Sequence, residues 1–159
     1  FFSTPTPPSP ILSGLVGSEM CIRDRDTITM ENVEKIYDYV FAPYVKQLKL
    51  SFLSIKKGKV VARLENSKDY QFVTGALSGQ ILMSVIDTVM SIAMNTSTKS
   101  QRGTLSQNNN FIRPAFGDYF IIESEVQRFG SSIAIGETKV YSEENRDVLC
   151  HATSTYPLK

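Results

Sequence analysis

The chain has 159 residues, of which 42% are hydrophobic and 21% charged, and its formal net charge is +1. This length and composition predict one globular domain with a single core, and exclude a disordered chain or a disulfide scaffold. The near-neutral charge argues against a nucleic-acid surface, two cysteines and one histidine are too few for a usual zinc site, and no apolar run is long enough to cross a membrane.

The first 29 residues differ in character from the rest. Phe1 to Gly14 is rich in proline, serine and threonine and has no periodicity, which is typical of a disordered tail. Leu15 to Arg25 resembles a translated sequencing adapter, so it is excluded from fold reasoning. We therefore expect residues 1–29 to be non-native or disordered, and residues 30–159 to form the domain. On that interpretation Cys150 is the remaining cysteine, which suits a reducing cytoplasm.

An amphipathic helix is predicted over residues 32–40, where apolar side chains recur at i, i+3, i+4 and i+7. Ala42-Pro43 is expected to end it. From Gln47 the period changes to two, which predicts a strand. A basic turn at residues 56–59 and a second apolar stretch at 60–64 complete a predicted hairpin.

Residues 78–95 are the most distinctive segment. Their apolar side chains fall on almost every face of a helical projection, which predicts a buried helix, and Ser78-Gly79 supplies a capping hydroxyl and a flexible residue. Asp87 is the only charge, and a buried ionised carboxylate is costly unless partners satisfy it. It shares one stripe of the helix with four polar residues: Gln80, Ser84, Ser91 and Asn95. Asp87 is therefore either a structural carboxylate or part of an active site.

The remaining chain predicts two loops, at residues 65–75 and 96–103, and four strands, at 104–114, 118–128, 133–141 and 148–156. Asn108 to Asn110 are poor strand formers, and such a local conflict tends to mark functional positions. A long apolar helix must be wrapped by a sheet, and short turns between consecutive strands make that sheet mainly antiparallel. The order of elements thus predicts an α+β domain.

Four motifs, in this order and spacing, resemble the hotdog-fold acyl-CoA thioesterases, specifically the PaaI-like group related to the 4-hydroxybenzoyl-CoA thioesterases. They are Ser78-Gly79-Gln80 followed by Asp87-Thr88, and the stretches 108–114, 128–134 and 151–156. The resemblance covers roughly Tyr39 to the C-terminus. It implies the hotdog fold, in which a strongly curved antiparallel sheet wraps one long helix.

The helix start departs from the pattern of that family, which is His-Gly-Gly, six residues and then the catalytic Asp. Ser78 stands in place of the histidine, which helps to orient the thioester, and Gln80 stands in place of the second glycine, which permits close backbone approach. Gln80 still has a backbone amide, so an oxyanion site survives in principle. The Gln80 side chain is expected to make the pocket narrower or its lining more polar.

The resemblance implies that Asp87 acts as a general base that activates water, or as a nucleophile that forms an anhydride. The amides of Gly79 or Gln80 would stabilise the oxyanion. The active site of the family lies between two subunits, which implies a homodimer or homotetramer. Acyl-CoA is the implied substrate, so coenzyme A is part of the substrate and no separate cofactor is expected.

Seven further residues are candidates for substrate binding: Ser78, Ser84, Asn108, Asn110, Arg113, Ser131 and Ser132. Asn108 and Asn110 share one face of their strand and are candidates for the subunit interface, although an open polar sheet face explains them equally well. The guanidinium of Arg113 suits a coenzyme A phosphate, or is simply solvated. Relatives often contact phosphate at the glycine turn that carries Ser131 and Ser132, and a plain hairpin turn is the alternative.

Two other functions are weighed against the thioesterase. A non-catalytic acyl-CoA-binding hotdog module is favoured by the missing His-Gly-Gly. A hotdog hydratase or dehydratase is disfavoured, because no histidine lies near Asp87. The only histidine, His151, is in the last strand, away from the motif at the helix start.

Overall fold

The computed structural model describes residues 27–158. Its helical elements are α2 (Val33–Val40), α3 (Pro43–Lys46), the 3₁₀ turn η2 (Lys68–Tyr70) and α4 (Gly79–Met94). Its strands are β1 (Leu50–Lys56), β2 (Lys59–Glu65), β3 (Ser106–Phe111), β4 (Tyr119–Phe129), β5 (Ile133–Ser142) and β6 (Val148–Pro157).

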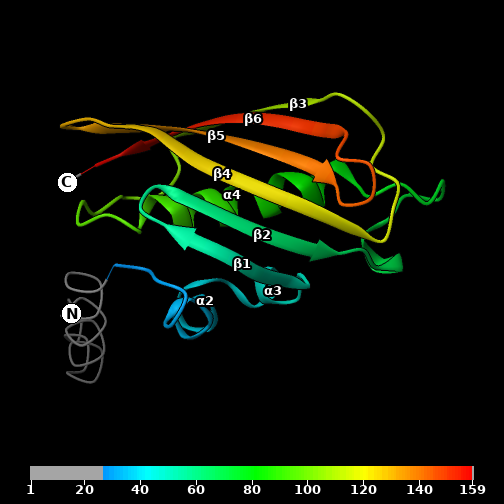
Figure 1. The fold of residues 1–159 in the computed structure, drawn as a ribbon, viewed down its shortest axis with the longest axis horizontal. Helices are drawn as coiled ribbons and strands as arrows, with labels where there is room; N and C mark the ends of the chain where they lie inside the picture. Colours follow the sequence, from blue (N-terminus) through cyan, green and yellow to red (C-terminus); the bar gives the residue numbers. More distant parts are fainter. Residues whose placement is uncertain (1–26, 159) are drawn as a thin grey trace, which may run out of the picture.

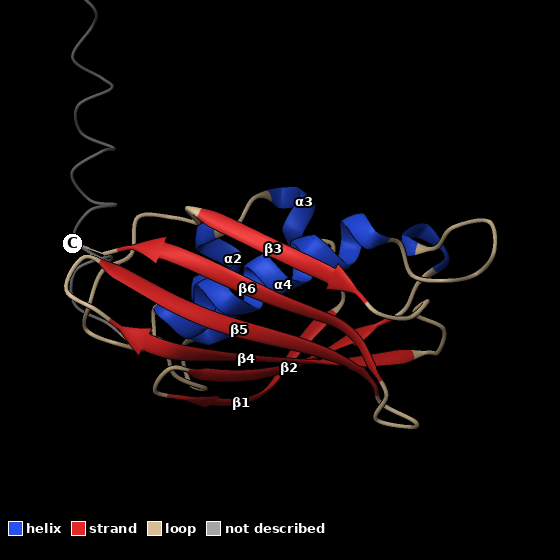
Figure 2. Cartoon of the chain, turned by 90° about the horizontal axis from the view of Figure 1, so that it is seen from above, coloured by secondary structure: helices blue, strands red, loops and turns tan. Residues whose placement is uncertain are grey.

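The six strands form one sheet in the order β1-β2-β4-β5-β6-β3, and every neighbouring pair is antiparallel. The sheet curves around α4, which lies along its inner face (Figures 1 and 2). Helix α2 packs its Tyr37 ring against Phe52 of β1, and α3 contacts α4. The predicted α+β architecture, the six strands and both longer helices are confirmed. None of the helices between residues 27 and 158 combines the length and apolar character needed to cross a bilayer.

Helix α4 begins where the sequence predicts. Ser78 is its N-cap, with extended backbone and a side-chain oxygen that accepts a hydrogen bond from the amide of Ile81 at 3.4 Å. Ten of the sixteen helical residues are buried, and they pack against fully buried strand residues such as Phe120 and Ile122. The helix comes close to Gly136 of β5, where an added Cβ would lie 2.5 Å from the side chain of Met90.

The burial of α4 differs from the prediction in one respect. Its polar stripe is the least buried face, so Asp87 is half-buried rather than enclosed, and Gln80 is exposed. The sheet of the same chain wraps the other faces of the helix and leaves this one open. Asp87 therefore avoids the full cost of burying a carboxylate.

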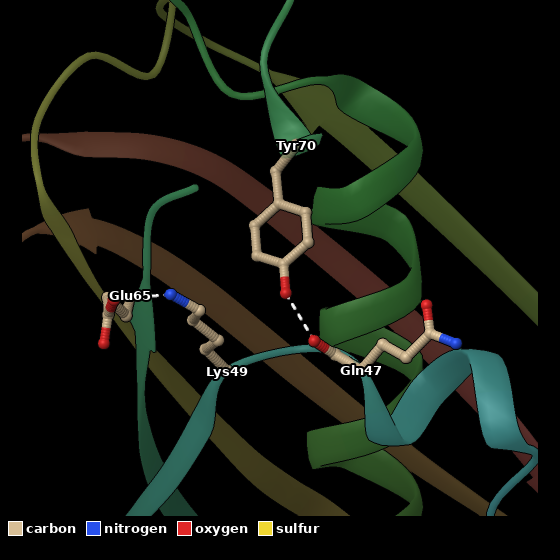
Figure 3. A network of polar contacts seen from close by, with 4 residues as sticks. All are labelled: Gln47, Lys49, Glu65 and Tyr70. Atoms are coloured by element: carbon tan, nitrogen blue, oxygen red, sulfur yellow. Dashed lines mark hydrogen bonds and ion pairs between the residues drawn. The ribbon is translucent and has the colours of Figure 1, made fainter. Parts of the chain in front are cut away.

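Two short elements were not predicted from the sequence, α3 and η2. Pro43 does not merely follow α2; it occupies the first turn of α3, where a missing N–H costs nothing. In η2 the Tyr70 hydroxyl donates to the carbonyl oxygen of Gln47, next to the ion pair between Lys49 and Glu65 (Figure 3). These contacts tie the loop after β2 to the chain that precedes β1.

The described chain makes core contacts from its first residues. Ile28 is 6% exposed, and its amide donates to the carbonyl oxygen of Asn95 at 3.0 Å. The side-chain oxygen of Asn32 accepts from the amide of Thr29 at 2.8 Å and so holds the turn that precedes α2. The predictions made for residues 1–26 lie outside the described residues.

Candidate active site

A pocket of about 620 Å³ opens at the N-terminal end of α4. Its walls come from three segments: the loop that includes Phe72 and Leu77, the first turn of α4, and residues 111–115. Most of these side chains are apolar. Three of the predicted site residues, Gly79, Gln80 and Arg113, line this pocket together.

The helix start presents backbone donors to this pocket. The amides of Gly79 and Gln80 belong to the first turn, where N–H groups have no carbonyl partner within the helix and the helix dipole is positive. Gly79 lies against the Phe111 ring, and an added Cβ would come within 3.4 Å of it. The first turn of α4 therefore packs against Phe111 where both line the pocket.

Backbone hydrogen bonds fix the position of the loop before α4. The amide of Ser78 donates to the carbonyl of Tyr70 at 2.8 Å, and the amide of Leu77 donates to the carbonyl of Ala115 at 2.9 Å. Tyr70 is in turn fixed by its contact with Gln47 (Figure 3). The helix N-terminus is therefore positioned by chain segments from both sides of the pocket.

Asp87 lies two turns further along α4 and is anchored by two hydroxyl groups. Tyr156 of β6 donates to its Oδ1 at 3.1 Å, and Thr104, in the loop before β3, donates to the same oxygen. Ser91, one turn later, is 3.1 Å from the Tyr156 hydroxyl. Within residues 27–158 no hydrogen bond reaches Oδ2. Sequence reasoning did not identify Tyr156 and Thr104 as partners of Asp87.

The comparisons with known proteins agree with this architecture. A model of the thioesterase superfamily matches residues 74–149, which include the pocket and Asp87. A protein of Saccharolobus solfataricus that is named as an esterase is 28% identical over 109 residues, 68% of this chain and 75% of that protein.

Three solved structures share the fold. Zebra fish thioesterase superfamily member 2 has a TM-score of 0.75 and 20% identity, over 84% of this chain and all of that one. The PaaI protein of E. coli has a TM-score of 0.72 and 15% identity, over 81% and 91% of the two chains. A Streptococcus mutans protein bound to acetyl CoA has a TM-score of 0.64 and 18% identity, over 69% and 88%. The chain has the hotdog fold and carries the sequence pattern of the thioesterase superfamily.

Strand β3 of this hotdog protein turns Gln107 toward α4, whereas the two asparagines predicted as interface candidates lie on its other face. Asn108 and Asn110 are exposed, and the Asn110 amide donates to the carbonyl of His151 at 3.4 Å. The half-buried residues on the alternate face are Gln107 and Asn109. Gln107 donates to the Met83 carbonyl at 3.1 Å and to the side chain of Asn109 at 3.0 Å. The period of two predicted that Asn108 and Asn110 share one face of the strand. The sequence alone did not tell which of the two faces meets α4.

The other predicted binding residues are distributed over both ends of the hotdog domain. Ser84 lies on the open stripe of α4, where its hydroxyl donates to the Gln80 carbonyl at 3.0 Å and contacts the Tyr44 hydroxyl at 3.1 Å. Arg113 is exposed at the pocket and donates to the carbonyl of Val148 at 2.9 Å.

Ser131 and Ser132 are exposed in the turn between β4 and β5. Lys99, just beyond the C-terminal end of α4, donates to the carbonyl of Gly130 in the same turn. The turn is thus at the opposite end of α4 from the pocket, so one chain does not bring these serines to Gly79.

The electrostatics of the site are those of a carboxylate among neutral hydroxyls. Burial raises the pKa of Tyr156 above its usual range, and the negative charge of Asp87 adds to this effect, so the phenol stays protonated as a donor. No ion pair in the described chain includes Asp87. His151 is 3.9 Å from Glu137. Among residues 27–158, no three acidic, histidine or cysteine side chains gather closely enough to hold a metal ion.

Proposed function

We propose that this hotdog protein hydrolyses an acyl-CoA thioester to a free acid and coenzyme A. The match to the thioesterase superfamily supports a thioesterase, and a structural neighbour from Streptococcus mutans is bound to acetyl CoA. The observation that carries the proposal is Asp87 itself. The half-buried carboxylate, the only charged group on α4, is fixed through one oxygen, which leaves the other for chemistry.

The chain offers the two components that thioester hydrolysis needs. As general base, Asp87 takes a proton from water while the water oxygen attacks the thioester carbonyl carbon. The negative charge on the carbonyl oxygen is stabilised by the amides of Gly79 and Gln80, and the C–S bond then breaks to release the CoA thiolate. In the alternative route, the carboxylate attacks the carbonyl carbon directly and forms a mixed anhydride, which water cleaves.

The spacing of these components supports a site shared by two chains. Eight residues separate Gly79 from Asp87, which is about 12 Å along a helix. The path from the carboxylate through a bridging water to the carbonyl, and on to the amide that binds the oxyanion, is about three hydrogen-bond lengths, or roughly 9 Å, which is shorter than this separation. Asp87 of one chain would therefore work with the helix N-terminus of another, in a homodimer or homotetramer.

The pocket fits the remaining parts of the substrate. Its apolar walls suit an acyl group, and the guanidinium of Arg113 at the same pocket suits a coenzyme A phosphate. In a shared site, Ser131, Ser132, Asn108 and Asn110 would meet the substrate from the partner chain. No cofactor beyond the coenzyme A of the substrate enters this mechanism.

The proposal is tested by release of free CoA thiol from acetyl-, medium-chain and aryl-CoA substrates. Asp87→Asn is nearly isosteric and should keep the fold while lowering kcat by roughly a hundredfold or more, because the amide accepts no proton. Asp38→Asn is the matched control, since Asp38 is an exposed carboxylate on α2 and should retain full activity. Undiminished turnover by Asp87→Asn would exclude Asp87 as base or nucleophile.

A non-catalytic acyl-CoA-binding module is the second candidate function. The observation in its favour is that Gln80, in place of the glycine of the family pattern, contributes to the pocket wall. Tight binding of acyl-CoA by the wild-type chain, measured by calorimetry, together with no thiol release from any substrate, would establish this function instead.

A further inference from the structure

The Tyr156 side chain is a large buried group whose only polar atom reaches the candidate catalytic residue. Its ring is fully buried at the end of β6, where the preceding inward-facing residues, Ala152 and Ser154, are small. The hydroxyl lies 3.1 Å from Asp87 Oδ1 and 3.4 Å from the Asp87 backbone carbonyl. A buried ring of this size has little freedom, so the position of its hydroxyl is fixed by packing.

The donor and the acceptor of each hydrogen bond in the group Ser91, Tyr156 and Asp87 can be assigned. A phenol has one hydrogen to donate and can also accept one. The carboxylate can only accept, so the Tyr156 hydrogen points to Asp87, and the Ser91 hydroxyl, 3.1 Å away, can donate to the Tyr156 oxygen. Ser91 and Tyr156 thus form a short chain of donors that ends on Oδ1.

The two carboxylate oxygens of Asp87 are therefore unlike each other. Oδ1 accepts from both Tyr156 and Thr104, whereas Oδ2 accepts from no group in the described chain. We propose that Tyr156 is a positioning residue, supported by Ser91, which anchors Oδ1 of Asp87 so that Oδ2 takes the proton of the attacking water. This inference rests on the proposed thioesterase function.

The neighbours of Asp87 make the expected pH effect simple to predict. The elements packed against this face of α4 contribute Tyr156 from β6, Thr104 from the loop before β3, and Tyr44 from α3, which bonds to Ser84 one turn earlier. Of these, Tyr156 is the titratable group in hydrogen-bond contact with the carboxylate. A hydrogen bond to an ionised carboxylate favours that form, so its loss moves protonation to higher pH.

The test is Tyr156→Phe in the full chain, with Tyr37→Phe as matched control. Tyr37 is also buried, and its hydroxyl donates to a backbone carbonyl, that of Val45, at 2.6 Å. We expect Tyr156→Phe to lower kcat for acyl-CoA by about tenfold to a hundredfold with KM little changed, and to raise the midpoint of the acid limb of the kcat profile by about one pH unit. Tyr37→Phe should move neither.

A pH profile for Tyr156→Phe that matches wild type, or a loss confined to KM, would overturn the inference. If Tyr156→Phe does not fold, Ser91→Ala carries the same test. An acid limb moved to higher pH in Ser91→Ala would support the positioning chain, and an unmoved limb would overturn it.

A measurement without substrate separates this inference from the proposed function. The Asp87 carboxyl carbon is followed by ¹³C NMR in the ligand-free protein and assigned by its absence in Asp87→Asn. A titration midpoint that rises in Tyr156→Phe supports the contact even if no thioester is hydrolysed, in which case the proposed function alone fails. An unchanged midpoint overturns the contact whatever the activity.

Discussion

Cys150 lies on the inner side of β6, is fully buried, and has a thiol whose pKa is raised to about 11 by burial. Its ordinary value is 9.0, so the folded chain holds this proton more tightly than the unfolded chain. The stabilisation is fully present below pH 9 and is lost as pH rises through 11. A buried thiol with a raised pKa packs as a small hydrophobe and is a poor nucleophile.

The free energy of unfolding should therefore fall between pH 9 and pH 11, by on the order of 2 kcal/mol from this thiol. Urea unfolding at several pH values measures the fall. Cys150→Ala serves as the comparison, because it removes the titrating group and should show a shallower decline. Equal slopes for the two proteins would contradict the role given to the thiol.

Sequence reasoning located Asp87 because a single charge on an apolar helix is a local signal. Its partners carry no such signal, since Tyr156 is 69 residues away and Thr104 is 17 residues away. A tyrosine hydroxyl in a strand has many possible destinations, and only the curvature of the sheet brings this one to α4. The roles of all the predicted site residues stay predictions.

At the scale of elements, local patterns were most informative where the element was long. The apolar run and the Ser78 cap predicted α4 to within a residue of its observed ends, and period-two alternation predicted β4, β5 and β6. Helix α3 was missed because four residues are too few to show a helical period. Strand β3 was predicted despite three asparagines, which its pairing with β6 accommodates.

The turn between β4 and β5 provides a test of hairpin geometry. At Gly130 an added Cβ would lie 2.6 Å from the Ile133 carbonyl oxygen, the atom that accepts the Gly130 amide hydrogen at 2.9 Å. Gly130→Ala should therefore lower the free energy of unfolding by roughly 1–3 kcal/mol, because a backbone atom must move. Ser131→Ala, next to it and exposed, should change stability by less than about 0.5 kcal/mol.

Thermal and urea unfolding of both variants, with circular dichroism to confirm the strand content, measures the difference. A Gly130→Ala protein as stable as Ser131→Ala would mean that this turn relaxes freely. The same Ser131→Ala protein, assayed with acyl-CoA, also tests the proposed contact to phosphate.

At the scale of the whole molecule, the separation between Asp87 and the helix N-terminus predicts complementation between chains. Asp87→Asn and Gly79→Val should each be inactive, the second because its side chain crowds Phe111 in the pocket. In a dimer co-expressed from equal amounts of both, half of the assemblies are mixed and each mixed dimer has one intact site. About a quarter of wild-type activity should return.

Purified mixed dimers, selected with two different affinity tags, provide the measurement, and each variant alone provides the control. Activity no greater than that of the two variants alone would place the base and the oxyanion donors in one chain. The architecture itself was predictable from the order of elements. The resemblance implied a site between two subunits, and the residue spacing along α4 supports that proposal once it is converted into distance.

Within one chain, the separation between the pocket and the Asp87 carboxylate also bears on how such a protein can change over evolutionary time. Side chains that shape the pocket, such as Phe72 and Met83, make no hydrogen bond to the group of residues around Asp87. Mutations at these positions can alter which acyl group is accepted while the hydroxyls on Oδ1 stay in place. Directed evolution of new acyl preferences should therefore succeed by single substitutions in the pocket, without a second mutation to restore turnover.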